Sequence, residues 1–133
     1  QNYETAEYVN KLDVTKDIIY TSYTLNEIVA NVVKYNHMDF EYYDEMGRMS
    51  TLDRESYLKI AKLTAILRVA NGLDRSHKQK FKNVKTKLMD NELVITVETN
   101  EDITLEKGMF SHRAEFFGEV YSVMPVIKQK RTL

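Results

Sequence analysis

The chain has 133 residues, of which 43% are hydrophobic and 29% are charged, and its formal net charge at pH 7 is −1. These proportions are typical of a soluble globular protein, and no apolar stretch approaches the roughly 20 residues of a membrane-spanning helix. Because cysteine is absent, a disulfide framework is excluded, and we expect a cytoplasmic protein that folds without disulfides or metal and has no membrane partner.

The first third of the chain is predicted to be helical. Residues 3–13 have the apolar spacing of a short helix, whereas the apolar residues 17–23 fit a strand or a helix equally well. Thr24 and Glu27 then form a capping-box pattern, and apolar residues follow at helical spacing. A second helix is therefore predicted to begin here and to end near residues 35–37, and a loop is predicted over residues 38–49.

Residues 57–77 contain the longest periodic apolar pattern and are predicted to form a central helix. Ser50 and Asp53 have capping-box spacing before it, and Gly72 is predicted to stop it in a left-handed conformation. The predicted buried face comprises Ile60, Leu63, Ile66, Leu67, Val69, Ala70 and Leu73. A structural role at the end of this helix is expected for Asn71, Gly72 and Asp74.

The pattern changes after residue 79. Residues 81–89 and 93–97 favour two strands around an Asp90-Asn91 turn, which predicts a β-hairpin. Helical spacing returns over residues 102–120, and residues 121–130 are predicted to form a last strand, with Pro125 at a sheet edge or at the strand start. We predict an α+β fold with an all-helical domain at residues 1–79 and a small β-β-α-β domain at residues 80–133.

Charged residues are grouped in blocks of opposite sign. Residues 68–87 contain seven Lys or Arg residues and one acidic residue, whereas residues 88–106 contain six acidic residues and no basic one. The tail is basic again, with Lys128, Lys130 and Arg131. Such a pattern indicates either a surface that attracts a polyanion or a solvated face that is neutralised by counterions.

Three stretches of the chain resemble the carboxyl-terminal region of the exopolyphosphatase / guanosine pentaphosphate phosphatase family. They are IAKLTAILRVANGLDRSH at residues 60–77, NEIVANVVKYN at residues 26–36 and FFGEVYSVMPVIKQKR at residues 116–131. The resemblance implies that a catalytic, actin-like phosphatase domain lies upstream and is absent here. It also implies that the helical part resembles His-Asp metal phosphohydrolases.

Two positions depart from the family pattern. Asn36 stands where the family has histidine, and Asn71 stands where it has aspartate. Amides are poor replacements for an imidazole or an anionic ligand, and the three histidines, His37, His77 and His112, are far apart in the sequence. We therefore expect a degenerate His-Asp-like part with no metal site and no cofactor, and any need for Mg²⁺ belongs to the parent enzyme.

The leading hypothesis is an accessory region without catalytic residues that holds a phosphate polyanion. Arginine and lysine suit this role because they bind phosphate oxygens through charge-assisted hydrogen bonds. Whether the parent enzyme uses inorganic polyphosphate or guanosine pentaphosphate is left open. The candidate polyanion-binding residues are Arg68, Arg75, His77, Lys78, Lys80 and Lys82.

Two alternatives remain open. The chain could be chiefly an assembly module, and a homodimer is expected with or without anion binding. It could also be an independent metal-dependent phosphohydrolase, which the ligand departures disfavour. A nucleic-acid partner is not expected, because residues 68–87 contain Phe81 as their one aromatic residue for stacking on bases.

Overall fold

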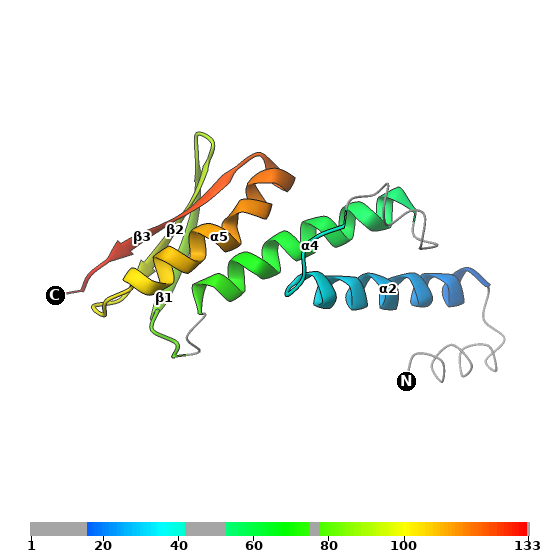
Figure 1. The fold of residues 1–133 in the computed structure, drawn as a ribbon, viewed down its shortest axis with the longest axis horizontal. Coiled ribbons are helices and arrows are strands. Elements are labelled where there is room, and N and C mark those ends of the chain that lie inside the picture. Colours follow the sequence, from blue (N-terminus) through cyan, green and yellow to red (C-terminus); the bar gives the residue numbers. More distant parts are fainter. Residues whose placement is uncertain (1–15, 42–52, 75–77, 133) are drawn as a thin grey trace. The chain divides into compact units, whose positions relative to one another are not determined.

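The computed structural model describes residues 16–41, 53–74 and 78–132. Along the chain these residues form α2 (Lys16–Tyr35), α4 (Arg54–Leu73), β1 (Asn83–Met89), β2 (Glu92–Glu98), α5 (Thr104–Tyr121) and β3 (Met124–Lys130) (Figure 1). Over the described ranges the fold is α+β, with three helices and a three-stranded mixed sheet, and the predicted β-β-α-β order is confirmed. The helix predicted at residues 3–13 and most of the loop predicted at residues 38–49 lie outside the described residues.

The chain divides into two compact units, residues 1–64 and residues 65–133. The sequence places the domain boundary at residue 79, so the unit that contains the sheet takes in more of the chain than predicted. The physical reason is the packing of α4, because Val69 and Leu73 belong to the same apolar cluster as residues of β2 and α5. In the part of the chain that the structure describes, no helix is both long and apolar enough to cross a membrane.

The described part of the first unit has a small core of aliphatic and aromatic side chains. Ile28 and Tyr35 of α2 are buried together with Ile60 of α4. The Phe40 ring centre lies 4.9 Å from that of Tyr35 and 5.7 Å from that of Tyr57, separations at which tilted rings attract one another. The segment after α2 is thus held by aromatic packing.

Helix α2 begins earlier than predicted. Because it starts at Lys16, Thr24 lies inside the helix, and the prediction that Thr24 and Glu27 mark its start is wrong. A helix that continues upstream satisfies its own backbone amides with preceding carbonyls, so no side-chain cap is needed at Thr24. The ambiguous residues 17–23 are helical, and the predicted end is confirmed, since α2 ends at Tyr35.

Helix α4 is capped by Asp53 itself. The backbone N–H of Ser56 donates to Asp53 Oδ1 at 2.8 Å, and the N–H of Tyr57 donates to the Asp53 carbonyl at 3.0 Å. Ser50, which the sequence pairs with Asp53, lies outside the described residues, and the capping contact that the structure describes joins Asp53 and Ser56. Hydrogen bonds from the side chain and the backbone of Ser56 lower the pKa of the Asp53 carboxyl.

The buried face of α4 differs in part from the predicted one. Ile60 and Val69 are buried as predicted, but Leu63 and Ile66 are exposed. The smaller side chains of Ala61, Thr64 and Ala65 take the buried positions. Small residues let a neighbouring element approach closely, so bulk hydrophobicity alone does not identify the buried side of this helix.

The sheet has the strand order β1-β2-β3. Strands β1 and β2 form the predicted hairpin, with Met89 opposite Glu92, and Asp90 adopts a φ of 53° in the two-residue turn. Strand β3 pairs with β2 in parallel, which requires a crossover connection, and α5 supplies it. Pro125 is the second residue of β3 and lies on an edge strand, as predicted from its missing N–H group.

One face of the sheet is covered by helices. Ile95 and Val97 of β2 pack with Phe110 and Ala114 of α5 in the core of this unit, and α5 also contacts β3 (Figure 1). The helix ends where Ser122 adopts a left-handed conformation with a φ of 55° and its N–H donates to the Gly118 carbonyl at 2.9 Å. Successive side chains of β2 point to opposite sides of the sheet, so the residues next to Ile95 and Val97 face the side that these core residues do not.

Candidate anion-binding surface

The second face of the sheet carries lysines from two distant parts of the sequence. The strand register places Lys85 of β1 and Lys128 of β3 opposite the same residue of β2, Thr96. Since neighbouring strands lie about 4.8 Å apart, the backbones at Lys85 and Lys128 are separated by about 10 Å across the sheet. The two basic blocks of the sequence thus meet on one surface.

Two more lysines extend this surface. Lys87 lies two residues after Lys85 and Lys130 lies two residues after Lys128, so strand alternation gives each pair the same face. All four lysines are exposed, and within the described ranges no carboxylate lies at ion-pair distance from any of them. We refer to Lys85, Lys87, Lys128 and Lys130 as the lysine face.

The lysine face also contains polar and acidic groups. Glu92 and Glu98 of β2 lie on this side of the sheet, with Val94 and Thr96 between them. Glu98 Oε2 accepts a hydrogen bond from Asn83 Nδ2 at 3.1 Å. The surface therefore has a net positive charge, and the cations occupy its two outer strands while the hydroxyl of Thr96 lies between them.

The predicted binding residues are divided among different environments. The Arg68 guanidinium lies 4.9 Å from the centre of the Phe116 ring, a cation–π distance, and its side chain is half-buried. Lys78 and Lys82 are exposed. Arg75 and His77 lie outside the described residues, so the structure gives no geometry for them.

Lys80 has a structural partner. Its Nζ lies 2.6 Å from Glu106 Oε1 and donates to the Asp102 carbonyl at 3.3 Å. Glu106 is buried with 2% of its surface exposed, and its hydrogen bond raises the pKa of Lys80. Binding an external anion would require this lysine to leave a buried carboxylate, so its geometry suits cohesion of the unit better than ligand capture.

The residues at the end of α4 have separate structural roles. Gly72 lies within the helix and its φ is not positive, so the predicted left-handed stop is wrong. A Cβ at this position would stand 3.2 Å from Arg113 Cβ and 3.3 Å from a ring carbon of Phe110, which shows that Gly72 allows close packing against α5. Asp74 accepts a hydrogen bond from the Gln79 N–H at 3.0 Å, and Asn71 is half-buried.

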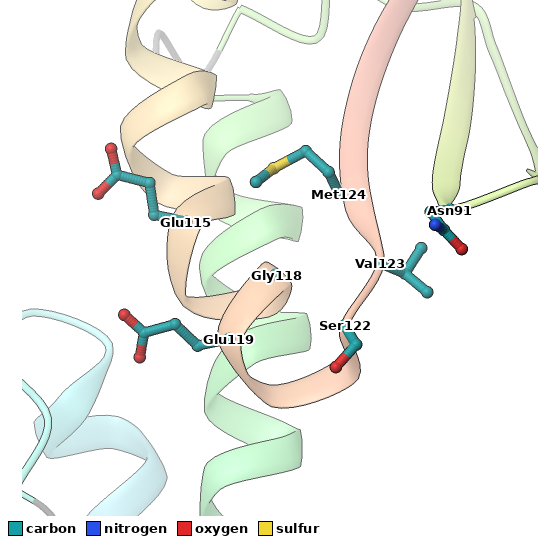
Figure 2. A pocket seen from close by; sticks show the side chains of 7 residues that line it. All are labelled: Asn91, Glu115, Gly118, Glu119, Ser122, Val123 and Met124. Carbon is teal, nitrogen blue, oxygen red and sulfur yellow. The ribbon is translucent and has the colours of Figure 1, made fainter.

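An open pocket of about 590 Å³ lies beside the end of α5. Figure 2 shows Glu115 and Glu119 on one turn of the helix, with their carboxylates extending away from Val123 and Asn91. Met124 points toward Gly118 and fills part of the space beside the helix (Figure 2). The charged groups do not converge on a common point, and their negative sign disfavours an anion at this pocket.

The described residues contain no group of three His, Asp or Glu side chains that could hold a metal ion. Asn36 is buried and its Nδ2 lies 3.3 Å from Nε2 of the neighbouring His37. His112 is exposed on α5, 3.7 Å from Glu115. These side chains can form local hydrogen bonds or ion pairs, but their geometry does not present a chelating set.

The lysine face was not among the candidate sites that the sequence indicates. A signal for it does exist, because Lys85 and Lys87, like Lys128 and Lys130, have the two-residue spacing of one face of a predicted strand. The missing information was the strand order, which decides whether the two pairs come together.

Comparisons with protein-family models, with curated proteins and with solved structures found no match to this chain.

Proposed function

We propose that this chain is the carboxyl-terminal accessory part of a cytoplasmic phosphatase of the exopolyphosphatase / guanosine pentaphosphate phosphatase type, and that it holds a linear phosphate polyanion. Hydrolysis belongs to an upstream domain of the parent enzyme, with any Mg²⁺ that it needs. The sequence resemblance and the charge blocks motivate this proposal.

The observation that carries the proposal is the position of Lys85 and Lys128 on either side of Thr96. Lysine ammonium groups are mobile point charges on long side chains, so they can follow a chain of repeating anions without a fixed geometry. None of the strand residues that share this side of the sheet is aromatic, among the residues that the structure describes, which favours a phosphate chain over stacked nucleotide bases. The exposed Lys78 and Lys82 lie just before β1 and can add to the same field.

The test is titration of the 133-residue chain with long-chain polyphosphate at low and moderate salt. We expect binding at low salt that weakens steeply as salt rises, because a polyanion releases counterions when lysines bind it. The variant Lys85→Ala with Lys128→Ala should bind more weakly. The control variant Lys62→Ala with Lys107→Ala, which removes two lysines from helices, should bind like the unsubstituted 133-residue chain. Absence of binding at low salt, or equal losses in both variants, would refute the proposal.

Assembly into a homodimer is a second candidate function, favoured by an apolar stripe on α2. Leu25, Val29 and Val33 follow one another at four-residue spacing, which places them on one side of the helix, and each is more than half exposed. Apolar side chains gathered on one side of a helix are typical of interaction surfaces. Light scattering across a range of concentrations should show a dimer that Val29→Asp dissociates, and a monomer at every concentration would exclude this function.

A further inference from the structure

Strand β1 is an open edge of the sheet. Within the described residues it pairs with β2 on one side and with no strand on the other, and all seven of its residues are exposed. An edge strand presents backbone N–H and C=O groups that another extended chain can use. β1 therefore offers main-chain pairing over a length of seven residues.

On the side of the sheet that the helices cover, β1 carries Val84 and Leu88 with Thr86 between them, and all three are exposed. The register places Val84 opposite Val97 and Leu88 opposite Leu93, so these side chains continue the apolar rows of the core. Val97 is fully buried, yet Val84 is 48% exposed and Leu88 is 64% exposed. Because α5 packs over β3 rather than β1, the helical cover ends before it reaches β1. We refer to the exposed side chains of Val84 and Leu88 as the apolar ledge.

The opposite side of β1 is cationic, which restricts the kind of strand that can pair with it. Lys85 and Lys87 lie on this side, and like charges on neighbouring strands destabilise a sheet. A second copy of β1 would bring its own two lysines to the same face. A strand with carboxylates at these positions would instead gain charge pairs while its apolar side chains cover Val84 and Leu88.

We propose that β1 accepts, by strand addition, an extended acidic segment in which carboxylate and apolar side chains alternate. In this mode the main-chain hydrogen bonds supply affinity and the alternating side chains supply specificity. The carboxylates face Lys85 and Lys87, and the apolar side chains lie beside Val84 and Leu88. The inference goes beyond polyanion binding, because it uses the backbone edge and the apolar ledge of β1.

The probe is a blocked peptide of seven residues with the order Glu-Val-Glu-Val-Glu-Val-Glu. Added to the isotopically labelled 133-residue chain, it should shift the backbone amide signals of β1 and slow their hydrogen exchange, while those of β3 stay unchanged. The same peptide with lysine in place of glutamate should not bind. Equal binding of both peptides, or shifts that map to β3, would overturn the proposal.

Main-chain pairing is tested on the peptide, which leaves the protein intact. Two peptides are N-methylated, one at its glutamates and the other at its valines, so each loses the N–H groups of one edge. One of the two should lose binding while the other retains it, because a single edge of the added strand faces β1. Unchanged binding of both N-methylated peptides would show that side chains alone hold the peptide and would overturn strand addition.

Protein variants separate this inference from the proposed polyanion function. Val84→Thr with Leu88→Thr should weaken peptide binding about tenfold and leave polyphosphate binding unchanged, since both side chains lie off the lysine face. Leu105→Thr is the matched control, because Leu105 is 66% exposed on α5 and should have no effect on either ligand. Equal effects of Leu105→Thr and of the β1 variant on peptide binding would count against the apolar ledge. Loss of polyphosphate binding in the β1 variant, with peptide binding retained, would instead count against the proposed polyanion function of the lysine face.

Discussion

Lys80 Nζ lies 2.6 Å from Glu106 Oε1 and joins the segment before β1 to the first turn of α5. The carboxylate is buried, whereas the lysine side chain keeps 20% of its surface in contact with solvent. A buried carboxylate is costly unless a cation and hydrogen-bond donors compensate its charge. Lys80, which the sequence analysis assigned to an external anion, therefore already has an anionic partner within the protein, Glu106.

We expect Lys80→Met to destabilise the fold more than Lys78→Met. The first change removes the cation beside a buried carboxylate, and the second removes an exposed cation from the same basic segment. Urea unfolding followed by circular dichroism should show a lower midpoint for Lys80→Met. Adding Glu106→Gln to Lys80→Met should recover part of the loss, and equal midpoints for the two single lysine variants would contradict this account.

Two glycines inside helices should respond differently to alanine. Among the described residues, no atom beyond the neighbours and helical backbone of Gly108 itself lies within 4 Å of a Cβ built there, so Gly108→Ala is expected to stabilise the chain by about 1 kcal/mol through helix propensity. At Gly72 the same gain is opposed by contacts of 3.2 and 3.3 Å with Arg113 and Phe110. Gly72→Ala should therefore be at least ~1 kcal/mol less favourable than Gly108→Ala in urea unfolding. Equal effects would show that α4 and α5 can separate at no cost.

The cap of α4 should make stability depend on acidic pH. Hydrogen bonds from Ser56 lower the pKa of Asp53 below its ordinary value of 3.8. The stabilisation is therefore complete above that value and is lost as the pH falls through the lower pKa of the folded state. Asp53→Asn keeps a good capping residue but cannot titrate, so it should flatten the acid limb of a stability–pH curve.

A control keeps the comparison at Asp53 specific. Glu115→Gln removes one exposed carboxylate from α5 without touching the cap of α4. Thermal unfolding between neutral and acidic pH should show the same loss of stability at acidic pH for this control as for the unsubstituted chain. An acid limb that stays the same in Asp53→Asn would contradict a role of the cap carboxylate in acid sensitivity.

The salt dependence of polyphosphate binding should count the lysines that take part. On a plot of log affinity against log salt concentration, Lys85→Ala and Lys128→Ala should each reduce the slope by about 0.7 to 1. Lys80→Met, if folded at the chosen temperature, should leave the slope unchanged because its charge is already paired with Glu106. A smaller slope for Lys80→Met than for Lys85→Ala would reverse the assignment of binding residues.

Several features follow from local sequence alone. The hairpin from Asn83 to Glu98 depends on branched residues around Asp90-Asn91, α5 depends on helical spacing, and the edge position of β3 is consistent with the missing N–H of Pro125. Short polar patterns were less reliable. Thr24 with Glu27 fits a capping box, but α2 starts at Lys16 and leaves this pattern unused.

The sequence by itself determined the α+β class, the β-β-α-β order and the separation of charge into blocks, because periodicity and composition are local properties of the chain. Tertiary structure alone decided that Lys80 pairs with Glu106 and that Gly72 packs against Phe110. It also brought Lys85 and Lys128 to the same row of the sheet. Each of these relations joins residues from different elements, so it depends on strand order and helix packing, which spacing along the chain does not encode.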